Sequence, residues 1–305
     1  MADIYPRPST LTRHKDTYPF ISPSKFTGKL KGKVVLITGA SRGIGRATAL
    51  ALAAAGASIA CLARTASVLD TLEAEIKQHF EVPTLFMIRD VVSDPAKIVS
   101  DVEAALGPID ILINNAGIGR LGPLYLEEDI NIWWHVFEVN VKAPIALIHA
   151  CLPSMLARRK GKIITLGSAA ADNSFPYQSS YASSKAALQK AHQGLDMEMR
   201  GKGIVFYCIH PGGTMGMGKK REGDAMNPEA MKLEELQSWI MNFAKTALTD
   251  TLSLAADSIV FLAVDERMEV FSGRYLDCCQ DMEEVLQNKD KILSEELNML
   301  NIKRL

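Results

Sequence analysis

Residues 33–52 read KVVLITGASRGIGRATALAL and contain the strongest indication of the fold. Lys33–Thr38 is a short apolar run, and a glycine-rich loop follows it at once. Ile44–Ala55 is then rich in alanine and leucine and stops at Gly56, a residue type that commonly ends helices. This order of residue types predicts a buried strand, a tight loop and a helix in direct succession.

The same alternation continues along the chain. Further strands are expected at 58–63, 84–89, 109–114, 162–168, 204–210 and 273–277. Further helices are expected at 67–79, at 93–107, in a long stretch that ends at Arg159, around Tyr181, and at 252–264. The strand runs are continuously apolar, as parallel strands covered on both faces are. We therefore predict an α/β fold: a Rossmann-type, doubly wound parallel sheet with helices on both faces in a single domain.

Three parts of the chain are distinguished by composition. Residues 1–30 form an N-terminal arm in which four prolines discourage regular structure. Residues 31–278 are the Rossmann-fold domain, and 213–245 within it are a long insertion before the next helix. Residues 279–305 are expected to form an amphipathic helical tail, broken at Lys289, that could pack on a second subunit.

Composition excludes several classes of protein. The 305 residues carry a net charge of −1, which does not favour binding to nucleic acid or to an anionic membrane. Five irregularly spaced cysteines match neither a disulfide framework nor a metal site, so we expect no metal and a reducing, cytoplasmic compartment. We find neither a signal peptide nor the ~20 consecutive apolar residues of a membrane span. The C-terminal Lys303-Arg304-Leu305 matches a peroxisomal targeting signal of the Ser-Lys-Leu type only in its last two residues.

The glycine-rich loop after the first strand could bind the diphosphate of a dinucleotide, because its glycines let the backbone come close and the amides of the next helix N-terminus can face the phosphates. A plain strand-to-helix turn is the alternative. The loop has the spacing Gly-x-x-x-Gly-x-Gly from Gly39 to Gly45, Asn114–Gly117 (NNAG) follows the fourth strand, and Tyr181 precedes Lys185 by four residues. Together these motifs resemble the short-chain dehydrogenase/reductase family over roughly residues 31–278. The resemblance implies that a nicotinamide dinucleotide contacts Gly39, Ser41, Arg42, Gly43, Ile44, Gly45, Arg64, Asp90, Asn115, Ala116, Gly117, Tyr181, Lys185, Pro211, Gly212 and Thr214.

The second strand points to the form of the cofactor. Members that use NAD typically end this strand with an acidic residue on the ribose 2′-hydroxyl, but here Ala63 and Arg64 occupy its end. Arg64 and Arg42 could instead clamp a 2′-phosphate. We therefore expect NADP(H), with two solvated surface arginines as the alternative.

The resemblance also implies a catalytic set of Ser168, Tyr181, Lys185 and Asn140. A free phenol has a pKa of about 10, and an adjacent ammonium favours its ionised form, so Tyr181 beside Lys185 could exchange a proton near neutral pH. By the resemblance, Lys185 also binds the nicotinamide ribose, Ser168 polarises the substrate carbonyl, and Asn140 holds a water that links Lys185 to solvent. The alternatives are a cap residue for Ser168 and a buried helix amide for Asn140.

Residues on the substrate side are expected to be apolar. Pro211-Gly212 matches the family's nicotinamide-cupping turn, but Thr214 and Gly216 depart from its usual Pro-Gly-x-Val-x-Thr pattern, which leaves the role of Thr214 in doubt. The insertion contains five methionines, Met215, Met217, Met226, Met231 and Met241, which pack adaptably against apolar shapes. We expect it to form a substrate lid, with Phe175, Tyr177, Trp133 and Trp134 as further wall residues; ordinary core positions are the alternative.

The sequence therefore favours an NADPH-dependent enzyme that reduces a ketone of a small or medium-sized, largely apolar substrate, with Tyr181 as general acid. NADP-dependent alcohol oxidation, a redox-silent isomerase or cyclase, and a cofactor-binding scaffold remain alternatives. The resemblance implies a homodimer or homotetramer.

Overall fold

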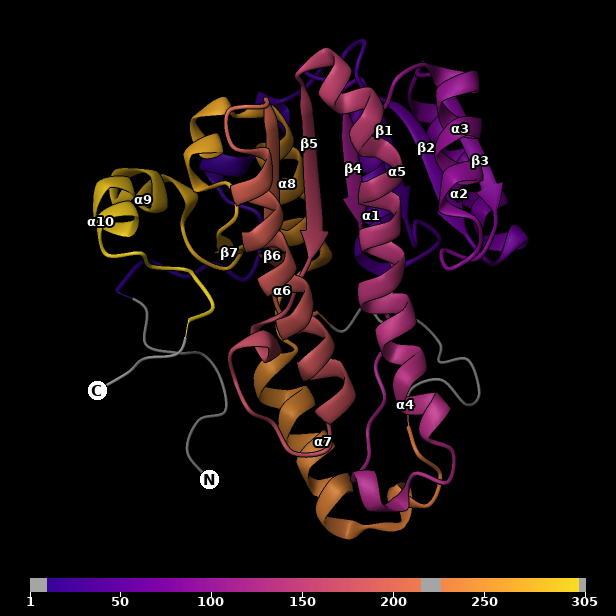
Figure 1. Ribbon diagram of the computed structural model, residues 1–305, viewed down its shortest axis with the longest axis vertical. Coiled ribbons are helices and arrows are strands. Elements are labelled where there is room, and N and C mark those ends of the chain that lie inside the picture. Colours follow the sequence, from indigo (N-terminus) through magenta and orange to yellow (C-terminus); the bar gives the residue numbers. More distant parts are fainter. Residues whose placement is uncertain (1–9, 215–225, 302–305) are drawn as a thin grey trace.

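The structure is a computed structural model that describes residues 10–214 and 226–301. Its centre is one seven-stranded sheet in the order β3-β2-β1-β4-β5-β6-β7, with every neighbouring pair parallel (Figure 1). The strands are β1 Val34–Thr38, β2 Ser58–Ala63, β3 Thr84–Ile88, β4 Ile111–Asn114, β5 Gly161–Leu166, β6 Ile204–His210 and β7 Tyr275–Asp277. Each begins and ends within two residues of its predicted bounds, and the predicted fold class is confirmed.

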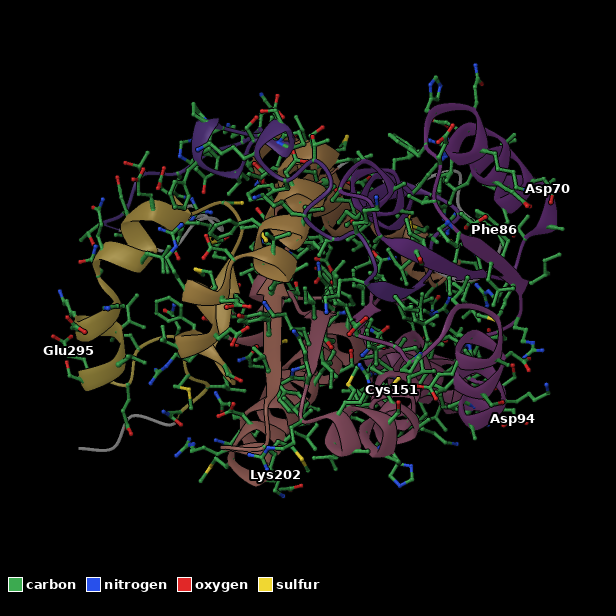
Figure 2. All side chains as sticks on the ribbon, turned by 90° about the horizontal axis from the view of Figure 1, so that it is seen from above. Asp70, Phe86, Asp94, Cys151, Lys202 and Glu295 are labelled. Atoms are coloured by element: carbon green, nitrogen blue, oxygen red, sulfur yellow. The ribbon has the colours of Figure 1, made fainter. Side chains whose placement is uncertain are left out.

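Helices cover both faces of the sheet. One face carries α1 Gly43–Ala54, α2 Ala66–His79 and α8 Leu252–Val264, and the other carries α3 Pro95–Leu106, α5 Ala143–Arg158 and α6 Ser179–Met199. Figure 2 shows the two layers from above, with Asp70 on one side of the sheet and Asp94, Cys151 and Lys202 on the other. Each layer buries its own apolar cluster against the strands, which explains why the strand sequences are apolar on both faces.

The boundaries of α3 illustrate how local sequence sets a helix. The Asp94 carboxylate accepts a hydrogen bond from the Lys97 amide at 3.0 Å and so caps the N-terminus, while Pro95 occupies the first turn. Gly107, with a φ of 96°, ends the helix in a conformation that other residues rarely adopt.

The long predicted helix before Arg159 is present but is not regular. It consists of α4 Ile130–Phe137, a π-helical segment Glu138–Lys142, and α5, which follow one another without a break. By length and apolar composition this 29-residue stretch could cross a membrane, which the sequence analysis did not foresee. In this protein it packs against α3, α6 and the sheet, as a core helix does.

Segments beyond the carboxyl ends of the strands form a third, smaller apolar cluster. Helix α7 Glu234–Ala247 and the short turn Ala230–Lys232 lie there together with α4 (Figure 1). Ala230, Leu236 and Trp239 are the buried members of this cluster.

The two ends of the described chain pack on each other. The Tyr18 hydroxyl accepts a hydrogen bond from the Met282 amide at 2.7 Å, and His14 lies 2.8 Å from the Asp281 carboxylate. The arm is more regular than its prolines predicted, because Pro19 and Pro23 each begin a short 3-10 turn. The tail forms two short helices, α9 Met282–Gln287 and α10 Lys289–Ser294; the interruption lies at Asn288, one residue before the predicted Lys289, which begins α10.

Candidate active site

The predicted catalytic side chains belong to elements that meet beyond the carboxyl ends of β4 and β5. Asn140 comes from the π-helical segment, Ser168 follows β5, and Tyr181 and Lys185 lie in the first turns of α6. Because all strands are parallel, their carboxyl ends lie at one edge of the sheet. Residues far apart in the sequence are thereby gathered at that edge.

Asn140 is held by three hydrogen bonds. Its Oδ1 accepts from the Ile118 amide at 2.9 Å, and its Nδ2 donates to the Ile118 carbonyl at 2.8 Å and to Ser184 Oγ at 3.0 Å. The side chain is only 1% exposed, so its alternative reading as a buried helix amide also holds. The π-helical widening around Asn140 is a feature that often marks functional sites.

Lys185 is buried beside Tyr181. Its ammonium donates to the Leu166 carbonyl at 2.6 Å and lies 5.7 Å from the centre of the Tyr181 ring. Lys185 is 5% exposed, whereas Tyr181 is partly open to solvent. The positive charge is thus fixed next to the phenol in a place that water screens poorly.

The loop after β4 lies against these three side chains. A Cβ atom on Gly117 would lie 3.4 Å from Asn140 Oδ1 and 3.7 Å from Lys185 Nζ. A Cβ on Gly119 would lie 3.5 Å from the Tyr181 ring. The backbone of this loop therefore brings Asn140, Lys185 and Tyr181 to one place.

Ser168 lies beyond the end of its strand rather than at the end. Strand β5 stops at Leu166, and Ser168 caps the 3-10 turn Ala169–Ala171 by accepting from the Ala170 amide at 3.1 Å. The alternative interpretation of Ser168, as a cap residue, therefore holds in the structure. The turn that it caps packs against α6, which carries Tyr181 and Lys185.

The glycine loop makes a tight turn that brings the start of α1 against the end of β1. A Cβ on Gly45 would lie 2.3 Å from the Gly39 carbonyl oxygen and 2.4 Å from Asn115 Nδ2, so helix α1 starts in direct contact with the loop only because residue 45 is glycine. Gly39 and Gly43 have φ values of 67° and 55°, in the left-handed region. The N-terminus of α1 then follows this close turn, where its amides can face an anion.

Thr38 is a site residue that the sequence analysis did not assign. Its Oγ1 accepts hydrogen bonds from the amides of Asn115 and Ala116 at 3.1 and 3.0 Å. In return, Asn115 Nδ2 donates to the Thr38 and Gly39 carbonyls at 2.8 and 3.1 Å. These bonds join the ends of β1 and β4, and the only local signal was a hydroxyl placed directly before the first glycine.

Ser184 is a second residue that was missed. Its Oγ accepts from Asn140 and donates to the Tyr181 carbonyl at 2.7 Å. It therefore connects the π-helical segment to the turn of α6 that carries Tyr181. In the sequence it was only one of several small residues around the Tyr-x-x-x-Lys pair.

The residues expected at the adenosine end lie at the ends of neighbouring elements. Arg42 occupies the N-cap position of α1, and Arg64 follows β2. Arg64 Nη1 lies 3.6 Å from the Asp90 carboxylate, which also accepts from the Val92 amide at 3.2 Å. Asp90 is thus paired with the arginine that was expected to bind a 2′-phosphate.

The turn after β6 is buried and closely packed. Gly212 has a φ of 89°, and Thr214 is only 7% exposed and pairs through its backbone with Asp250. The sequence analysis had not assigned Asp250. At the C-terminus of β6, burial lowers the pKa of His210, whose Nδ1 accepts from the Ala169 amide.

The apolar cluster on the substrate side includes several predicted wall residues. Phe175, Tyr177 and Met231 pack on its buried core, with Trp239 stacked at 5.0 Å on Phe243. Met241 is 65% exposed and is not a member of this cluster. Trp134 is 53% exposed, and Met215 and Met217 lie outside the described residues.

This fold and site define a dinucleotide-dependent oxidoreductase. The family model for short chain dehydrogenases matches residues 33–225. A short chain dehydrogenase from Pseudocercospora fijiensis is 43% identical over 90% of this chain and 89% of its own length, and one from Monascus ruber is 35% identical over 93% and 90%. The chain belongs to the short-chain dehydrogenase/reductase family.

Solved structures agree with this assignment. A putative NAD(P)-dependent gluconate 5-dehydrogenase from Beutenbergia cavernae, crystallised with bound NADP, matches with a TM-score of 0.69 and 26% identity over 83% of this chain and 96% of its own. A metagenomic short-chain oxidoreductase in complex with NADP matches with a TM-score of 0.61 and 28% identity over 78% and 93%.

Proposed function

We propose that this protein uses NADPH to reduce a ketone of a small or medium-sized, largely apolar substrate to an alcohol. The observation that carries the proposal is the contact of the loop after β4 with Asn140, Lys185 and Tyr181, described above. A polar amide, an ammonium and a phenol placed together in this way can deliver a proton to a substrate oxygen and replace it from solvent.

NADP(H) is supported by charge at the end of β2. Ala63 and Arg64 stand where an acidic residue would repel a 2′-phosphate, and Arg42 occupies the N-cap position of the neighbouring helix α1. Two solved relatives were crystallised with NADP. Arg64 would bind the 2′-phosphate, and the turn between Gly39 and Gly45 would hold the diphosphate.

Each of the four predicted catalytic residues would have its own role in the reaction. NADPH, when bound, supplies a hydride to the carbonyl carbon. Tyr181 donates its phenolic proton to the carbonyl oxygen, and the Lys185 ammonium stabilises the phenolate that remains. Ser168 holds and polarises the carbonyl oxygen, and Asn140 positions a water through which Lys185 regains a proton from solvent.

The expected class of substrate follows from the apolar cluster beside the site. Phe175 and Tyr177 lie on the loop that leads into α6 and pack with Trp239 and Phe243 of α7. Tyr177 adopts a φ of 65°, which is unusual for an aromatic residue. Aromatic rings on this side favour ketones with a ring or a long apolar group.

The test is to mix the protein with NADPH and a panel of aromatic and alicyclic ketones, and to follow the loss of the reduced-nicotinamide absorbance. Tyr181→Phe should then lower kcat by about 10²-fold or more, since it removes the general acid. Tyr125→Phe, the same change at a side chain that is 77% exposed, should leave kcat unchanged. Full turnover by Tyr181→Phe would remove Tyr181 from its role. Tight NADPH binding without turnover of any ketone by the unaltered enzyme would favour a scaffold, isomerase or cyclase.

We further propose that the protein is a homodimer or homotetramer in a reducing, cytoplasmic compartment. All five cysteines are buried and free, which is the state that a reducing compartment maintains. Light scattering during size-exclusion chromatography measures the oligomer, and a monomer at micromolar concentration would contradict the first part.

A further inference from the structure

The turn after β6 is fixed by one side chain that belongs to a distant part of the chain. The Asp250 carboxylate, between α7 and α8, accepts a hydrogen bond from the Gly213 amide at 2.7 Å. The Asp250 amide donates back to the Gly213 carbonyl at 2.8 Å. Two hydrogen bonds between the same two residues set both the distance and the orientation of this turn.

The glycines of the turn are a consequence of this close approach. A Cβ on Gly213 would lie 1.7 Å from the Ala247 carbonyl oxygen, and a Cβ on Gly212 would lie 2.9 Å from the Asp250 carboxylate. Neither position can hold a larger residue while the 247–250 segment stays where it is. The position of the turn therefore depends on the position of that segment, and a displacement of Asp250 would move the turn.

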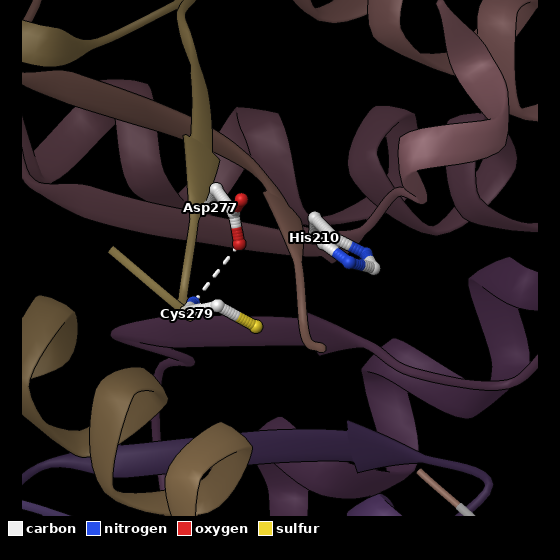
Figure 3. A group of neighbouring side chains, drawn as sticks. All are labelled: His210, Asp277 and Cys279. Carbon is white, nitrogen blue, oxygen red and sulfur yellow. Dashed lines mark hydrogen bonds between the residues drawn. The ribbon is translucent and has the colours of Figure 1, made fainter. Parts of the chain in front are cut away.

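Asp250 is itself held by residues of β7, the tail and the N-terminal arm. The Cys279 thiol donates to the same carboxylate oxygen at 3.3 Å, and the Cys279 amide donates to Asp277 at 2.9 Å (Figure 3). Arg13 of the N-terminal arm donates to the other Asp277 oxygen at 2.9 Å. The next residue, Thr251, bonds through its amide to the Lys15 carbonyl at 2.8 Å. The arm thus secures both sides of Asp250.

The same cluster contains three potential metal ligands. Ligand atoms of His210, Asp277 and Cys279 lie within 4.8 Å of one another. However, the Arg13 guanidinium already bonds to the Asp277 carboxylate, and the Cys279 thiol already bonds to Asp250. A cation would have to displace an arginine from its carboxylate, so this network is better explained as a support for the turn than as a metal site.

We propose that Asp250 is a positioning residue for hydride transfer: it holds Pro211–Gly213 in the place where this turn supports the nicotinamide ring. The inference rests on the proposed function and on the family resemblance, which implies that Pro211-Gly212 cups the nicotinamide. Asp250 acts through the turn and not by contact with the substrate. Its loss should therefore misplace the nicotinamide end of the cofactor and leave the adenosine end unaffected.

The test compares Asp250→Ala with Asp250→Asn, which keeps an oxygen that can accept from the Gly213 amide. With the best ketone of the panel, Asp250→Ala should lower kcat about 10- to 100-fold, since small misplacements of reacting groups have effects of this size. Asp250→Asn should stay within about threefold of the unaltered enzyme. NADPH deuterated at both C4 positions should give a larger isotope effect on kcat in Asp250→Ala, because hydride transfer becomes slower relative to the other steps.

Binding measurements provide a readout that does not depend on turnover. The fluorescence of bound NADPH reports on the nicotinamide, and it should change in Asp250→Ala. The dissociation constant of adenosine 2′,5′-bisphosphate, a probe of the adenosine end alone, should stay within about twofold. Lys245→Ala, at an exposed position of the last turn of α7, is the control and should change none of these values.

Several outcomes would overturn the inference. These are an unchanged kcat and isotope effect in Asp250→Ala, equal losses in the Ala and Asn variants, or an equal weakening of the bisphosphate probe. If Asp250→Ala does not fold, Asp250→Glu replaces it, because it moves the carboxylate by about 1.5 Å and should produce the same pattern; normal kcat there would also overturn the inference. Ketone reduction by the unaltered enzyme tests the proposed function separately.

Discussion

Replacement of Asn140 by leucine tests the core of the site. Leucine has nearly the shape of asparagine but cannot form the two hydrogen bonds to Ile118 or the one to Ser184. The amide and carbonyl of Ile118, a partly buried residue, would then lose this partner. An unsatisfied buried polar group costs about 1–3 kcal/mol, and partial burial places each group in the lower half of that range, so the free energy of unfolding should fall by about 2–4 kcal/mol.

The assay is urea unfolding followed by circular dichroism, together with ketone reduction by the folded variant. Ser184→Ala is the matched control, since it removes one hydroxyl partner and should cost only about 1 kcal/mol. The folded Asn140→Leu variant should also lose most of its kcat, because the proposed water relay is gone. If its stability lies within about 0.5 kcal/mol of the unaltered protein, water satisfies Ile118 and the structural reasoning is wrong.

Three further perturbations follow from the structure. Gly45→Ala should weaken NADPH binding at least about tenfold, because its Cβ would overlap the Gly39 carbonyl at 2.3 Å, and unchanged binding by fluorescence titration would contradict the proposed diphosphate turn. Arg64→Asp should weaken NADPH binding by about tenfold or more and NADH binding little, and equal effects on both would exclude a 2′-phosphate contact. Burial lowers the pKa of His192 from 6.5 to about 4, so between these pH values the unfolded chain binds a proton that the folded chain does not. The free energy of unfolding should therefore fall as the pH drops through this range, by up to ~3 kcal/mol. The loss should be smaller in His192→Phe, and identical pH profiles of the two proteins in urea unfolding would refute this.

Some contacts near the site had no signal in the sequence. The polar atoms of Asn140 were recognised as a candidate, but their partner, the backbone of Ile118, lies 22 residues away. The π-helical segment was predicted as ordinary helix, since nothing in Glu138–Lys142 breaks the helical pattern. The prolines of the arm indicated irregular structure, yet the arm binds β7 through Arg13 and Asp277, and binds the tail through His14 and Asp281.

From the sequence alone follow the positions of the strands along the chain, their bounds to within two residues, the sites of the glycine turn and of the Tyr-x-x-x-Lys pair, and the family. These depend on short-range properties: continuous apolar runs, glycine conformations and the period of a helix. Only the folded chain shows that Thr38 joins two strands, that Ser184 connects Asn140 to α6, and that Asp250 holds the turn after β6. Such contacts join segments whose separation along the chain carries no pattern, because they arise from how whole layers pack and from which buried polar groups must then find a partner.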